Sequence, residues 1–151
     1  MRVLIDTNII LDALLEREPF VREAEALFEA IESRQIEGYV TATTLTDIFY
    51  IVRKSRGVPT AKQAVSRILA GMEICTVDRS ILEAAISSNL PDFEDAVQVA
   101  CALNENLDAI ITKSPQTPEV PSGVTVTRDS QDFADATLPI LSAGELLQGL
   151  S

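Results

Sequence analysis

The stretch that decides the fold is RVLIDTN, residues Arg2–Asn8 of the 151-residue chain. Its apolar run, Val3–Ile5, ends on the carboxylate of Asp6, and two small polar residues follow. This pattern predicts a strand over residues 2–5 and a helix directly after it. Ligands of α/β proteins bind at the carboxyl ends of strands, which would place Asp6 at the floor of a site. Asp, Thr and Asn also cap helices, so this stretch alone leaves both a site and an N-cap open.

The size and composition of the chain are those of a globular domain. With 151 residues and a hydrophobic share of 46%, the chain is long enough to bury a core, so we expect a single domain over residues 1–151. No apolar run approaches the roughly 20 residues of a membrane-spanning helix, so no membrane association is expected. The apolar run after Arg2 is also too short for the core of a signal peptide, which favours a cytoplasmic location.

The formal net charge is −11, and the chain contains no histidine. The lack of histidine excludes Ser-His-Asp and Cys-His nucleophile systems and imidazole metal ligands. A metal site here would consist of oxygen ligands, which favour hard ions such as Mg²⁺ or Mn²⁺. The acidic balance argues against broad electrostatic binding of nucleic acid, but it is compatible with a small metal-bridged site or a basic protein partner. We interpret Cys75 and Cys101, which form no CxxC pair, as reduced, buried thiols.

Apolar periodicity and turn residues predict strands that alternate with helices. The expected strands cover residues 2–5, 39–41, 74–77, 109–112, 124–127 and 139–141, and the expected helices cover residues 8–16, 19–32, 43–53, 60–70, 79–87, 92–103 and a C-terminal segment that opens with a capping box at Ser142–Glu145. A break is expected at Gly38, and a proline-rich loop over about residues 113–124. This alternation is typical of the α/β class, with a mainly parallel sheet between two helix layers, a three-layer α/β/α sandwich.

Acidic residues fall at the ends of strands or at the beginnings of helices in this scheme. They are Asp6, Asp47, Asp92, Glu94, Asp95 and Asp129. Carboxylates from separate segments that meet in one cleft repel each other, and a divalent cation relieves that repulsion. Such an ion activates water and polarises phosphate oxygens, so phosphodiester hydrolysis needs no histidine.

Each acidic residue also has a structural interpretation. Thr44–Asp47 has the spacing of a capping box, and Asp92 can cap the helix that follows it. Glu94 and Asp95 can complement the dipole of that helix, although Asp95 borders its apolar face. We interpret Asp12, Asp78 and Asp108 as solvated or capping residues, while Asp132 fits either role.

Four motifs resemble the PIN-domain family. VLIDTNIILDA (residues 3–13) is similar to the opening of that family, and DFEDAVQVACA (residues 92–102) is similar to its acidic helix. TRDSQDF (residues 127–133) resembles a late family motif, and LPILS (residues 138–142) resembles the usual ending. The resemblance covers nearly the whole chain and implies a PIN-like fold. It also implies a metal-dependent ribonuclease, which in many small bacterial members is a VapC-like toxin held by an antitoxin, and it implies a homodimer.

The resemblance also implies roles for individual residues. Asp6 and Asp95 would be direct ligands of Mg²⁺ or Mn²⁺, and Asp47 and Asp129 would complete the shell or position the attacking water. Asn8 or Thr7 would supply a neutral hydrogen bond to Asp6 or to a metal-bound water. The auxiliary candidates are Asp92, Asp132 and Arg128, the last as a phosphate contact. The substrate would be RNA.

Two departures from the family pattern bear on this assignment. Many relatives have Glu where this chain has Asp47, whose shorter side chain reaches one methylene less. The late motif also arrives after an insertion of about a dozen residues between Lys113 and Thr127, instead of directly after its strand. We favour Asp129 as the fourth acid because the rest of the motif accompanies it. In the alternative, Ser114 takes that structural position and the site has three acids.

Further functional interpretations stay open. A catalytically degenerate PIN fold that serves as an RNA-binding or regulatory module is the main alternative. Aspartyl-phosphate chemistry is disfavoured, because it needs a second acid where this chain has Asn8. The basic residues Arg53, Lys54 and Arg56 either complement a helix dipole or contact RNA. Exposed apolar residues of the helices before Gly57 are one possible dimer interface.

Overall fold

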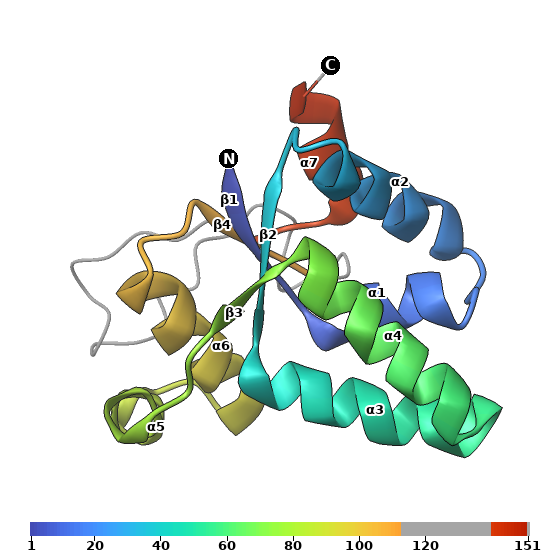
Figure 1. The fold of residues 1–151 in the computed structure, drawn as a ribbon. Helices are drawn as coiled ribbons and strands as arrows, with labels where there is room; N and C mark the ends of the chain where they lie inside the picture. Colours follow the sequence, from blue (N-terminus) through green and yellow to red (C-terminus); the bar gives the residue numbers. More distant parts are fainter. Residues whose placement is uncertain (113–139, 151) are drawn as a thin grey trace.

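The computed structural model describes residues 1–112 and 140–150, in which five parallel strands form one sheet. The strand order is β3-β2-β1-β4-β5 (Figure 1). The strands are β1 (Arg2–Ile5), β2 (Glu37–Thr41), β3 (Glu73–Cys75), β4 (Ala109–Ile111) and β5 (Ile140–Leu141). Register is set by pairs such as Leu4 with Tyr39 and Leu4 with Ile110. The expectation of a mainly parallel α/β sheet is confirmed.

Helices cover both faces of this sheet, which gives three layers. They are α1 (Thr7–Leu14), α2 (Val21–Glu32), α3 (Ala42–Arg56), α4 (Val58–Gly71), α5 (Arg79–Ser87), α6 (Phe93–Asn104) and α7 (Ala143–Leu150). Buried residues of α1, α2, α3, α4 and α7 form one apolar cluster with the sheet, and those of α5 and α6 form a second cluster on the other face. The two groups lie on opposite sides of the strands in Figure 1.

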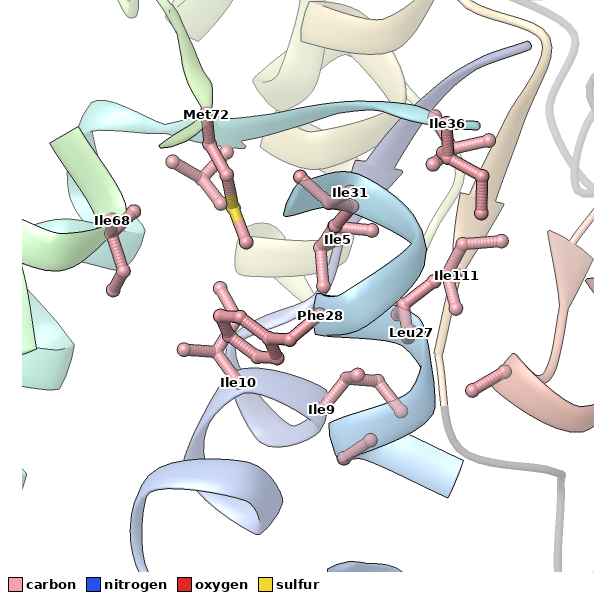
Figure 2. Close-up of a cluster of buried hydrophobic side chains, with 14 of the residues drawn as sticks. Ile5, Ile9, Ile10, Leu27, Phe28, Ile31, Ile36, Ile68, Met72 and Ile111 are labelled. Atoms are coloured by element: carbon pink, nitrogen blue, oxygen red, sulfur yellow. The ribbon is translucent and has the colours of Figure 1, made fainter. Parts of the chain in front are cut away.

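The strands are apolar at successive positions because both of their faces are buried. Val3 and Ile5 belong to the cluster of α1 and α2, whereas Leu4 between them belongs to the cluster of α6. Figure 2 shows the first cluster, where Leu27 and Phe28 of α2 lie close to the side chains of β1, β4 and α1. This two-sided burial explains why the strands lack a polar alternation, as is usual in parallel sheets.

The strand order creates a topological switch point between β1 and β4. The chain moves from β1 outward to β2 and β3, and then returns to the other side of β1 to form β4. Crossovers that leave in opposite directions open a crevice at the carboxyl ends of the two strands, where ligands of α/β proteins bind. Asp6 lies at this point, and its backbone N–H donates to the carbonyl of Ile111 over 2.9 Å.

Several expectations about local structure are confirmed. Ser142 and Glu145 form the reciprocal capping box, with two hydrogen bonds of 3.1 Å. Cys75 and Cys101 are free and buried, and burial raises their pKa values to about 12 and about 11, which makes both thiols unreactive. Among the described residues, no helix has the length and apolarity needed to cross a membrane.

Gly38 was wrongly expected to be a break, because it is paired with Val3 inside β2. A Cβ atom at this position would lie 2.9 Å from Cδ1 of Ile31, so glycine allows α2 to pack closely on the strand. The break before α4 is at Gly57, whose φ of +88° favours glycine. The expected strand at residues 124–127 and the proline-rich loop at 113–124 lie outside the described residues.

Candidate carboxylate site

The side chain of Asp6 is held by two hydrogen bonds from distant parts of the chain. Nε2 of Gln98 donates to Oδ1 over 2.9 Å, and Oγ1 of Thr112 donates to Oδ2 over 3.0 Å. Asp6 occupies the N-cap position of α1, but its carboxylate makes no capping hydrogen bond. The capping alternative is therefore excluded for this side chain. Its half-buried carboxylate is oriented at the switch point instead.

Asp47 lies in the second turn of α3, where it cannot cap the helix. The N-cap is Thr41, whose Oγ1 accepts from the backbone N–H of Thr44 over 3.1 Å. The interpretation of Thr44–Asp47 as a capping box is therefore wrong, since α3 begins at Ala42. Thr44 instead shares a buried hydrogen bond of 3.0 Å with Oγ1 of Thr7, which ties the beginning of α1 to the beginning of α3.

The beginning of α6 brings three acidic residues to the same area. Asp92 caps this helix, as expected for its structural role, and accepts from the backbone N–H of Asp95 over 2.9 Å. Glu94 reaches Asp47, and the hydrogen bond between the two carboxyl groups raises the pKa of Glu94 to about 7. Burial and the charges of Asp47, Asp6 and Asp92 act in the same direction. Glu94 therefore links α6 to α3.

Asp95 is exposed overall, but its carboxyl group is partly buried by neighbouring protein atoms. This burial raises its pKa to about 6, and the charges of Asp92 and Asp6 add to the effect. A raised pKa of an acid means that its ionised form is disfavoured in the native state. The charges of Asp6, Asp47 and Asp92 are thus close enough to oppose the ionisation of the carboxyl groups on α6.

The donor chemistry of this site fits a hard divalent cation, because every acidic side chain offers oxygen and the ionised groups repel. In the described ranges, 1–112 and 140–150, no group of three acidic or thiol side chains is arranged to hold a metal ion. Asp129, the expected fourth acid, lies outside these ranges together with Arg128 and Asp132.

Three side chains of the site were missed by sequence reasoning about function. Glu94 was counted among the converging acids but given no individual role beyond the helix dipole, and no role was assigned to Gln98 or Thr112. The available signal was Gln98, a polar residue within the apolar run 96–102 of α6 that is only 4% exposed. A buried polar side chain needs a partner, and here the partner is Asp6. Asn8, expected to supply a neutral hydrogen bond, is solvent-exposed.

The interpretation of Asp12 as a solvated or capping residue is wrong. Its side chain is fully buried, and its Oδ1 lies 3.9 Å from Nη1 of Arg17. Asp12 borders a pocket of about 330 Å³ between α1, α2 and the beginning of α7. Asp78 does cap α5, accepting from the backbone N–H of Ile81 over 3.1 Å, which lowers its pKa.

The raised pKa values predict that the metal-free protein loses stability as the pH rises. Glu94 and Asp95 hold protons in the native state at pH values where the unfolded chain has released them. Their contribution is fully present below the unfolded pKa values near 4 and disappears as the pH rises through about 6 and about 7. Urea unfolding from pH 4 to pH 8 should reveal a decline, and Glu94→Gln should flatten it by roughly 1 kcal/mol or less, since solvent screens these groups.

Glu73→Gln is the matched control for this pH series, because Glu73 is exposed at the beginning of β3, the opposite end of the strands from the site. It should keep the wild-type pH dependence. If the stability of Glu94→Gln changed with pH in parallel with that of wild type and of Glu73→Gln, the raised pKa of the Glu94 carboxyl would be contradicted.

A family model described as PIN domain matches residues 2–114. Because this match covers most of the chain, and because the parallel sheet carries acidic residues at its switch point, the protein belongs to the PIN domain family. No curated protein sequence matches the chain.

Three solved structures with the same fold are of toxins or toxin–antitoxin complexes. VapBC2 from Rickettsia felis, bound to a DNA fragment from its promoter, has a TM-score of 0.61 and 14% identity, covering 94% of this chain and 98% of its own. A toxin–antitoxin complex from Klebsiella pneumoniae has a TM-score of 0.57 and 23% identity, covering 76% and 88%. VapC20 from Mycobacterium tuberculosis, a toxin that cleaves the sarcin-ricin loop, has a TM-score of 0.59 and 14% identity, covering 72% and 86%. At these identities the likeness establishes the fold.

Proposed function

We propose that the protein is a metal-dependent endoribonuclease that hydrolyses RNA phosphodiester bonds with Mg²⁺ or Mn²⁺, and that it is the toxin of a toxin–antitoxin pair. The observation that carries the proposal is the Asp6 carboxylate, oriented by Gln98 and Thr112 near Glu94 and Asp95 of α6, the first of which contacts Asp47 of α3. Two side chains fix the orientation of one carboxylate at a ligand-binding crevice. Such support indicates a site whose geometry matters. Membership of the PIN domain family and the toxin–antitoxin relatives support the same function.

We assign the roles of Asp6, Asp47, Glu94 and Asp95 from their positions, and that of Asp129 from the family resemblance alone. Asp6 and Asp95 are the direct ligands, and Asp47, Glu94 and Asp129 complete the shell or position the attacking water. When bound, a divalent ion supplies a nucleophilic hydroxide near neutral pH and stabilises the leaving oxygen. Gln98 and Thr112 keep the Asp6 carboxylate in one orientation, so that its free lone pairs point consistently into the crevice. Asn8, exposed next to Asp6, is available to bind water.

Cleavage of a labelled single-stranded RNA tests this function directly. Wild-type protein should cut the RNA with Mg²⁺ or Mn²⁺ and should stop cutting when EDTA is added. Asp95→Asn, purified in the same way, should not cut under either condition. Cleavage that survives both EDTA and Asp95→Asn would contradict the proposal, because it would come from a contaminant or from metal-independent chemistry.

The remaining parts of the proposal concern partners. A basic antitoxin suits the net charge of −11, and a small protein encoded directly upstream that co-purifies with the chain as a stable complex would support it. We also propose a homodimer, measurable by light scattering of the purified chain. The alternative, a degenerate PIN fold that binds RNA, predicts RNA binding without cleavage at any metal concentration.

A further inference from the structure

Helix α3 carries a line of exposed side chains that follows the half-buried Asp47 and leads away from the carboxylate site. Residues three, four and seven positions apart share one face of a helix, so Asp47, Tyr50, Ile51 and Lys54 follow one another along α3. Tyr50 is 61% exposed, and Lys54 is exposed as well. Seven helical residues rise about 10 Å, so Lys54 follows Asp47 within two turns. In Figure 1, α3 extends away from α6, whose Glu94 contacts Asp47.

The C-terminal half of α3 holds a group of positive charges. Arg53, Lys54 and Arg56 are all exposed. In the part of the chain that the structure describes, the ion pairs involve Arg2, Arg17, Arg67 and Arg79, and none involves these three residues. In a protein with a net charge of −11, such a patch is where a polyanion can approach without repulsion.

An aromatic ring lies between the acidic and the basic parts of this face. The Tyr50 ring contacts Phe49 edge to face, with centroids 5.3 Å apart, and Phe49 in turn packs on the buried cluster. The guanidinium carbon of Arg53 lies 5.9 Å from the centre of the Tyr50 ring. An exposed ring held in place beside cations is the combination that binds single-stranded nucleic acid, since bases stack on the ring and phosphates meet the cations.

We propose that the α3 stripe, defined as Tyr50 and Lys54, binds the single-stranded segment of RNA next to the phosphate at the carboxylate site. This inference deepens the proposed function and depends on it for the position of the scissile phosphate. The cations offset the repulsion between RNA and the acidic site, and Tyr50 stacks a base beside it.

Dipole complementation and self-association are two roles of this face that experiment can separate from RNA binding. Cations in the last turn of α3 complement its dipole, and Arg56 does so as well as Lys54. However, Arg56 is nine residues from Asp47, about half a turn out of phase, so it projects from the opposite side of the helix. A second copy of the chain could also cover the stripe, but a symmetric contact would bring two sets of cations together.

Binding is measured by fluorescence anisotropy of a labelled single-stranded RNA with the wild-type chain in EDTA, which prevents metal-dependent cleavage. Tyr50→Leu should weaken binding about tenfold, whereas Tyr50→Phe should retain it. Lys54→Gln should weaken binding and reduce the slope of log K against log salt by about 0.7, the value for one lost phosphate contact. Arg56→Gln, the matched control on the other side of α3, should bind like wild type.

Several results would overturn the α3 stripe as an RNA site. They are an absence of binding by the wild type, equal binding by Tyr50→Leu and wild type, or equal losses in Lys54→Gln and Arg56→Gln. A dimer that dissociates in Tyr50→Leu while RNA binding is unchanged would assign the stripe to a second copy. Failure of the proposed function is distinguishable, because RNA binding through the stripe without cleavage in Mg²⁺ would reject the nuclease and support the stripe.

Discussion

Asp6→Asn should reduce metal-dependent cleavage of single-stranded RNA by about 100-fold or more. Loss of a direct metal ligand removes several kcal/mol of transition-state stabilisation, and each 1.4 kcal/mol is about tenfold in rate. Asparagine has nearly the same shape as aspartate, keeps one oxygen for the Gln98 donor and can donate its amide N–H to the Thr112 hydroxyl, so the fold around the site should persist. The measurement is the single-turnover cleavage rate at saturating protein.

Thermal unfolding gives an independent measure of the same residue. Mg²⁺ or Mn²⁺ should raise the melting temperature of the wild type, because ions that bind the native state stabilise it and relieve carboxylate repulsion. Asp6→Asn should reduce this response, while Glu73→Gln, far from the site, should keep it. Equal responses of wild type and Asp6→Asn would show that Asp6 is not a ligand of a shared metal site.

Leu27→Ala should have the largest effect on stability. Leu27 is fully buried where α2 packs on α1 and the sheet, and its side chain lies in the middle of the cluster in Figure 2. Truncation of a buried leucine costs about 2–5 kcal/mol, a large share of the 5–15 kcal/mol that stabilises a typical domain. The melting temperature should fall by about 5–20 °C, and urea unfolding should show a lower midpoint with an unchanged slope.

Leu69→Ala is the matched control for this truncation. Leu69 belongs to α4 and is 55% exposed, so the same change of side chain removes little buried surface. Its effect should stay within about 0.5 kcal/mol. If both variants melted at the same temperature, the cluster around Leu27 would not be the main core of this face.

The sequence was sufficient to predict the order of strands and helices, because each strand is a short apolar run and most helices have an apolar face. It was insufficient where packing decides the local structure. Gly38 was expected to be a break because glycine often interrupts a pattern. The close approach of Ile31 instead requires a glycine inside the strand. The beginning of α3 was also mispredicted, because Thr44 was expected to form the cap and Thr41, three positions earlier, forms it instead.

The acidic residues of the candidate site could be predicted from the sequence, but the side chains that hold Asp6 in place could not. Asp6, Asp47 and Asp95 each follow a recognisable local pattern. In contrast, Gln98 is 92 positions from Asp6, and Thr112 is 106 positions from it. These contacts exist only because β4 pairs with β1, and no local pattern encodes that pairing. Glu94 was undervalued for the same reason, as its partner Asp47 belongs to another helix.

The switch point between β1 and β4 also sets when the site can form during protein synthesis. A ribosome releases the chain from the N-terminus, so β1 and α3 emerge long before α6 and β4. Until Gln98 and Thr112 have left the ribosome, the Asp6 carboxylate has neither of its two donors. The site is therefore assembled only when most of the chain has been translated. An activity against RNA would then begin only after the segment that contains Thr112 has left the ribosome.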